Sequence, residues 1–88
     1  MPTRGRPGCQ IDLLIQCRRS LHFVEIKRKV EIGHEVVDQV DAAVQSISRP
    51  DGVSAHTALV YDGHLAPTVV SDGYFDALIP FKDLLGLR

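Results

Sequence analysis

Hydrophobic and polar residues alternate in two short segments near the start of the chain. Apolar side chains recur at every second position over residues 11–16 and again over residues 23–27. A period of two is typical of β-strands. The link between the two segments is polar and contains Arg18 and Arg19. We therefore expect an antiparallel hairpin centred on these two arginines.

The register of this hairpin brings two carboxylates together. With the turn centred on Arg18 and Arg19, Asp12 faces Glu25, and Lys27 lies on the same face. Directly opposed residues have Cβ atoms about 4.5–5.5 Å apart, and like charges at that separation destabilise the pair. A divalent cation would remove the repulsion, and Mg²⁺ is usually held by one or two carboxylates together with phosphate and water. The sequence therefore predicts a Mg²⁺ or Mn²⁺ site on the hairpin.

The rest of the chain predicts a crossover unit. Over residues 33–48 the apolar side chains recur at steps of three and four, as on one face of a helix. The later elements are predicted in this order: a strand over residues 55–61 that stops at Asp62-Gly63, a helix over 67–72, a short strand over 77–79 and a turn of helix over 81–85. A strand, a helix and a second strand in succession indicate a right-handed βαβ connection.

The length of 88 residues suits one small domain. Residues 1–8 are rich in proline and glycine and are interpreted as a flexible lead-in or linker remnant, so the domain is expected over residues 9–88. The net charge of −1 excludes a global basic field for nonspecific nucleic-acid binding. Basic residues nevertheless cluster around the hairpin, and the candidates for phosphate contact are Arg18, Arg19, Arg28 and Lys29. The alternative is that these are solvated loop charges.

The cysteines and histidines predict neither a disulfide nor a zinc site. Cys9 and Cys17 fall at opposite ends of one predicted strand, which favours a reduced, intracellular chain. The histidines show no zinc-ligand spacing with the cysteines, and His22 is interpreted as a surface residue facing Ile15. Neither a signal-peptide pattern nor an apolar run long enough for a bilayer occurs, so we expect a cytoplasmic protein without membrane contact.

An Asp on one strand with Glu-X-Lys on the adjacent strand resembles the PD-(D/E)XK nuclease superfamily, which has the restriction-endonuclease-like fold. The resemblance implies that Asp12 and Glu25 ligate Mg²⁺ or Mn²⁺, that the Ile26 carbonyl completes the metal shell and that Lys27 steadies the attacking water or the transition state. Many members also place a glutamine on the following helix. Gln39 matches it, because helical angles put it at the border of the apolar stripe.

A longer resemblance covers nearly all of the chain from Gly8 onward. Residues 8–15, 24–27, 73–75, 79–81 and 83–85 look like the nuclease-like C-terminal domain of a group of bacterial AAA-type ATPases. This similarity implies an ATPase module as a partner. No Walker-type glycine-rich loop occurs in these 88 residues, so ATPase activity is not expected from them.

These observations lead to one expected fold and two expected functions. The fold is α/β, with a restriction-endonuclease-like central mixed sheet of hairpin, helix and strand, flanked by helices and with the usual N-terminal core helix missing or truncated. The leading function is metal-dependent hydrolysis of nucleic-acid phosphodiester bonds, with DNA favoured through the resemblance. The alternative is a non-catalytic module that binds nucleic acid or a protein partner, including a homodimer that covers the surface left by the missing helix. A purely structural remnant comes third.

Overall fold

Four strands form one mixed sheet in the computed structural model, which describes residues 11–85. The elements are β1 (Leu13–Gln16), β2 (Ser20–Ile32), α1 (Glu35–Ser46), β3 (Ser54–Leu65), α2 (Pro67–Asp72), β4 (Ala77–Pro80) and α3 (Phe81–Leu85). The strand order is β1-β2-β3-β4, with β1 antiparallel to β2 and the other neighbours parallel. The predicted α/β class and mixed sheet are therefore confirmed. The predicted lead-in of residues 1–8 lies outside the described residues.

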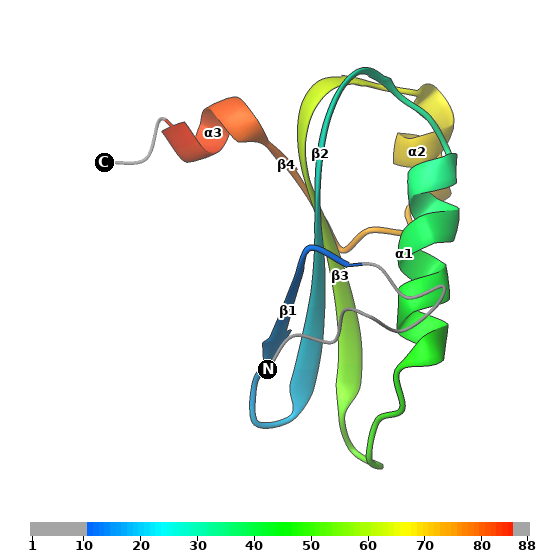
Figure 1. Cartoon of the computed structure of the whole chain (residues 1–88), viewed down its shortest axis with the longest axis vertical. Coiled ribbons are helices and arrows are strands. Elements are labelled where there is room, and N and C mark those ends of the chain that lie inside the picture. The colour runs from blue at the N-terminus through cyan, green and yellow to red at the C-terminus, as the bar shows by residue number, and fades with distance from the viewer. Residues whose placement is uncertain (1–10, 86–88) are drawn as a thin grey trace.

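Helix α1 connects the two parallel central strands and packs on one face of the sheet (Figure 1). Its apolar stripe buries Val36, Val37, Val40 and Ala43. Against them lie Phe23 of β2 and Leu59 of β3, both with no exposed surface. Val69 brings α2 into the same core. The predicted βαβ unit is confirmed, because β2 and β3 run parallel on either side of the connection.

The two faces of the hairpin differ in burial. The face that carries the charged residues packs against α1, since Phe23 lies on it and is fully buried. Beside Ser20 and His22, the other face carries apolar side chains that are half exposed: Leu13 at 46%, Ile15 at 43% and Ile26 at 44%. Sheets with parallel strands normally have both faces covered. Among residues 11–85, α1 and α2 cover only one.

Strands β2 and β3 are both longer than their hydrophobic patterns predict. The strand predicted to stop at Asp62-Gly63 continues to Leu65, because Arg28 pairs with Asp62 and Ile32 with Leu65 as β2 continues alongside. The register shifts between Arg28 and Glu31, which marks a β-bulge. Gly63, with φ of 138°, lies against this irregular stretch. A glycine is needed there because the backbone of β2 at Lys29 comes close to it, and not because the chain turns at this point.

The C-terminal elements agree with the sequence predictions. Helix α2 begins at Pro67 and is capped by Gly73, which is left-handed with φ of 66° and donates its N–H to the Val70 carbonyl. Tyr74 then donates its hydroxyl to Asp41 of α1 at 3.2 Å, and Phe75 is buried. None of the described helices has the length and hydrophobicity needed to span a bilayer.

The contact between Gly63 and β2 predicts a specific loss of stability. A Cβ atom at Gly63 would overlap the Lys29 carbonyl oxygen, whereas at Gly52, also at positive φ, it would meet no atom. We expect Gly63→Ala to lower the free energy of unfolding by about 3 kcal/mol, and Gly52→Ala by about 1 kcal/mol. Urea unfolding of both variants measures the difference. Equal losses would show that Gly63 matters only through its backbone angle.

Candidate functional site

The hairpin register places Asp12 beside Glu25, as predicted. Leu13 of β1 pairs with Val24 of β2. Asp12, one residue before Leu13, therefore lies next to Glu25, one residue after Val24. Asp12 itself lies just before β1, and its Oδ2 atom accepts a hydrogen bond from the Ile26 backbone N–H at 2.9 Å. This bond ties the Asp12 carboxylate to β2 next to Glu25.

Glu25 is a buried carboxylate held by two side chains. It is 3% exposed and lies on the face of β2 that α1 covers. Its Oε2 atom accepts a hydrogen bond from Gln39 Nε2 at 2.9 Å and lies 3.2 Å from Lys27 Nζ. Lys27 Nζ in turn donates to Gln39 Oε1 at 3.1 Å. Glu25, Lys27 and Gln39 therefore form a closed triangle of contacts between β2 and α1.

The second oxygen of Glu25 is left without a partner. Oε1 is fully buried and forms no hydrogen bond of acceptable geometry with the described residues, although the Asp12 backbone N–H lies close enough to the carboxylate to lower its pKa slightly. A buried acceptor in this state carries the full cost of losing its hydration, about 1–3 kcal/mol and more for a charged group. Folded proteins rarely leave such an atom unpaired, and when they do a bound ion or water is a common reason. The unpaired oxygen can therefore accept one further ligand, either a water molecule or a cation.

The electrostatics of Glu25 lead to the same conclusion. Burial raises the pKa of the Glu25 carboxyl above its ordinary value of 4.5, and the nearby charge of Asp12 raises it further. The Lys27 ammonium opposes this shift, and the Asp12 backbone amide opposes it less, but the net direction is upward. Asp12 and ionised Glu25 together carry two negative charges, of which Lys27 offsets one. A proton or a metal ion would relieve the excess.

The donor set suits a hard divalent cation. Asp12 and Glu25 supply two carboxylates, which is the number that Mg²⁺ commonly takes from protein before water and substrate phosphate complete its shell. Within residues 11–85, no group of three or more His, Cys, Asp or Glu side chains is arranged to ligate a metal. A closed structural zinc site, which needs four such ligands, is therefore not what these residues offer. The predicted role of the Ile26 carbonyl stays a prediction.

Two of the predicted phosphate contacts, Arg28 and Lys29, follow Lys27 along β2 but are already paired. Arg28 forms an ion pair with Asp62 at 3.5 Å, and its guanidinium stacks over the Phe81 ring at 5.7 Å. Lys29 pairs with Glu35 at 3.2 Å. All four charged groups are exposed, so these pairs are weak and a phosphate could displace them.

The other two predicted contacts are not brought to the site. Arg18 and Arg19 occupy the tip of the hairpin, which is the far end of β2 from Lys27. From Arg19 to Glu25 the strand advances roughly 20 Å at about 3.3 Å per residue. These arginines would therefore touch only a long substrate that follows the hairpin.

One polar cluster was missed by the sequence interpretation. His22 and His56 were assigned no joint role, yet their rings stack with centroids 4.9 Å apart. Each histidine follows a serine by two positions, Ser20 in β2 and Ser54 in β3. This repeated Ser-X-His pattern was the available signal. It became meaningful only with the parallel register, which pairs the two segments residue by residue.

No protein-family model, curated protein or solved structure matches the chain significantly. What the site does is therefore inferred from the chemistry of its own residues.

The raised pKa of Glu25 predicts a pH-dependent effect of Glu25→Gln. A carboxyl whose pKa is raised by folding contributes most stability below its unfolded value of about 4.5, and that contribution is lost as pH rises through the folded pKa. Glutamine stays neutral throughout. In metal-free buffer, we expect the free energy of unfolding of Glu25→Gln to increase relative to that of the native chain as pH rises from 4.5 to 8.

Urea unfolding at a series of pH values measures this difference. Glu31→Gln, a change at an exposed glutamate of the same strand, controls for the loss of one negative charge. A constant difference between Glu25→Gln and the native chain over the whole pH range would show that the protein does not resist ionisation of Glu25.

Proposed function

We propose that this chain is a metal-dependent nuclease domain that hydrolyses nucleic-acid phosphodiester bonds, with DNA as the favoured substrate and a restriction-endonuclease-like fold. The observation that carries the proposal is the buried Glu25 carboxylate, whose Oε1 atom has no partner among the described residues although Asp12 and Lys27 are beside it. Two carboxylates and a lysine on adjacent strands are the groups that metal-assisted phosphodiester hydrolysis needs.

Each side chain has a defined role in this proposal. Asp12 and Glu25 hold the divalent cation, and the Ile26 N–H keeps the Asp12 carboxylate in place. When bound, such an ion polarises a phosphoryl oxygen and lowers the pKa of coordinated water. Lys27 places a positive charge where negative charge develops on the phosphate, and it is only partly exposed, which strengthens its effect.

Gln39 acts as a positioning residue from α1. Its amide donates to Glu25 through Nε2 and accepts from Lys27 through Oε1, so a single side chain fixes the relative placement of both groups.

A metal titration tests the binding part of the proposal. A ligand that binds only the folded state at a hundred times its Kd adds about 2.7 kcal/mol of stability, which for a domain of this size raises Tm by about 15 °C. We expect such a rise with Mn²⁺ for the native chain and none for Asp12→Asn or Glu25→Gln. Asp62→Asn, which removes an exposed carboxylate elsewhere, should respond like the native chain. An unchanged Tm of the native chain would reject the metal site.

Lys27 separates metal binding from catalysis. Its ammonium lies 3.2 Å from Glu25 Oε2 and competes with a cation for that carboxylate. We expect Lys27→Met to keep the Mn²⁺-dependent rise in Tm while cleaving single- and double-stranded DNA about 100-fold more slowly than the native chain, the order of effect seen when one transition-state donor is removed. The two proteins are purified identically to exclude a contaminating nuclease. Equal cleavage rates would remove Lys27 from the mechanism.

A second candidate function is a non-catalytic module that binds a protein partner. The half-exposed apolar face of the hairpin favours it, because Leu13, Ile15 and Ile26 lie together on the face opposite α1. At Leu13, Ile15 and Ile26 the face carries no charged side chain, so this part of it can pack against a second copy of itself without like-charge repulsion. Two sheets packed in this way would stack about 10 Å apart.

Sedimentation velocity at rising protein concentration distinguishes this second function. Packing through the apolar face predicts a dimer that Ile26→Lys converts to a monomer, while Val30→Lys, at a side chain that is 87% exposed, leaves the dimer intact. A chain that stays monomeric at every concentration would exclude the homodimer and leave this face to another partner.

A further inference from the structure

A pair of Ser-X-His segments lies side by side in the sheet. The parallel register of β2 and β3 pairs Ser20 with Ser54 and His22 with His56. The two imidazoles stack with centroids 4.9 Å apart and an angle of 18° between the rings. These residues alternate with Leu21 and Phe23, which face α1. The pair therefore lies on the opposite face of the sheet from Glu25 and is separate from the candidate metal site.

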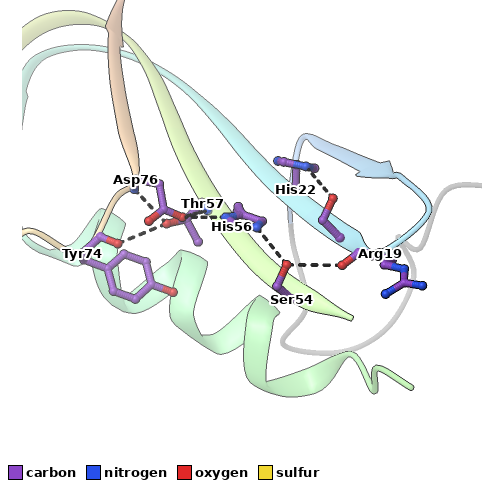
Figure 2. Close-up of polar contacts among 8 residues, drawn as sticks. Arg19, His22, Ser54, His56, Thr57, Tyr74 and Asp76 are labelled. Carbon is purple, nitrogen blue, oxygen red and sulfur yellow. Dashed lines mark hydrogen bonds and ion pairs between the residues drawn. The ribbon is translucent and has the colours of Figure 1, made fainter. Parts of the chain in front are cut away.

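Both segments contain the same serine–histidine contact. Ser20 Oγ lies 2.9 Å from His22 Nε2, and Ser54 Oγ lies 2.9 Å from His56 Nε2. Among residues 11–85, only the second pair has a carboxylate next to its histidine: Asp76 Oδ2 is 3.6 Å from His56 Nδ1. Figure 2 shows His56 between Ser54 and Asp76. The order serine, imidazole, carboxylate is that of a nucleophile, its base and the group that orients the base.

Asp76 is held firmly against β3. Its Oδ2 atom accepts a hydrogen bond from the Thr57 backbone N–H at 2.9 Å, and its own N–H donates to the Thr57 carbonyl at 2.9 Å. Thr57 Oγ1 donates in turn to the Tyr74 carbonyl at 3.2 Å (Figure 2). The carboxylate is thus fixed next to the strand that carries His56. Catalytic hydrogen bonds are often long in a ligand-free protein, as at the 3.6 Å contact.

We infer that Ser54 is a nucleophile activated by His56 and Asp76, and that the chain has a second activity, the hydrolysis of small esters with an apolar acyl group. A cavity of about 420 Å³ on this face is lined by His22, His56 and Asp76 among others. Ser54 is not one of its lining residues but contacts His56, which is. The apolar lining of the cavity comes from Ile15, Val24, Ala58 and Ala77. Cavities of this size with a few convergent polar groups are typical of small-molecule sites.

The reaction needs only the ester and water. Ser54 Oγ attacks the ester carbonyl carbon while its proton passes to His56 Nε2. The bond from that carbon to the alcohol oxygen then breaks, and His56 returns the proton to the departing alcohol. Water, deprotonated by His56, attacks the acyl-serine and releases the carboxylic acid and free Ser54. For the first step the Ser54 hydroxyl turns from the Arg19 carbonyl, 3.3 Å away, toward His56.

The test uses a fluorophosphonate, which reports a nucleophilic serine by losing fluoride as it bonds to Oγ. The labelled chain is digested and the modified serine is located by mass spectrometry. Ser20 is an internal control, because it has the same contact with a histidine but no carboxylate behind that histidine among the described residues. We expect Ser54 to be labelled about 100-fold faster than Ser20, the lower range for a positioned general base.

Two variants show whether the label depends on the proposed contacts. His56→Gln should abolish labelling of Ser54 and hydrolysis of p-nitrophenyl butyrate. Asp76→Asn keeps an oxygen for the Thr57 N–H but removes the charge, so it should slow both reactions while urea unfolding stays native-like. Equal labelling of Ser54 and Ser20, labelling that survives His56→Gln, or no labelling of the native chain would each overturn the inference.

Glu25→Gln keeps this test separate from the proposed nuclease. Because Glu25 faces α1 and Ser54 faces the opposite side of the sheet, the variant should label Ser54 at the native rate, with or without a metal chelator. Labelling that requires Mn²⁺ would show instead that the two faces share one activity.

Discussion

The structure depends on one costly interaction, the burial of the Glu25 carboxylate beneath α1. A charged group in the core must be paired and hydrogen-bonded, and Glu25 satisfies this with Lys27 and Gln39 on only one of its two oxygens. The hydrogen bonds of Gln39 thereby join α1 to β2 through polar side chains within an otherwise apolar layer. The requirement also fixes which face of β2 the helix covers, because Glu25 and Phe23 share that face.

The candidate site was predictable from the sequence because its geometry is local. The register of a hairpin follows from its centre and a period of two, which was enough to place Asp12 beside Glu25. The angle between residues on a helix placed Gln39 at the edge of the apolar stripe, and its amide does contact both Glu25 and Lys27. Each step required only short-range regularities.

The remaining features depend on contacts between distant segments. The hydrophobic pattern could not show that β2 and β3 continue together beyond Asp62-Gly63, since each strand is extended there by pairing with the other. The stacking of His22 on His56 depends on the same parallel register. Nor does the pattern identify the buried face, because Leu13, Ile15 and Ile26 lie on the face that α1 leaves half exposed. The position of α1 on the sheet, and not the hydrophobic pattern of the hairpin, determines which face of the hairpin is buried.

The most direct test of the metal site is the anomalous scattering of Mn²⁺ in a crystal grown or soaked with that ion. We expect one strong anomalous peak in coordination contact with Glu25 Oε1 and an Asp12 carboxylate oxygen, while Gln39 and Lys27 remain on Glu25 Oε2. A well-ordered Glu25 without a peak beside it, in a crystal saturated with Mn²⁺, would contradict the assignment. The buried carboxylate would then be explained by its contacts with Lys27 and Gln39 alone.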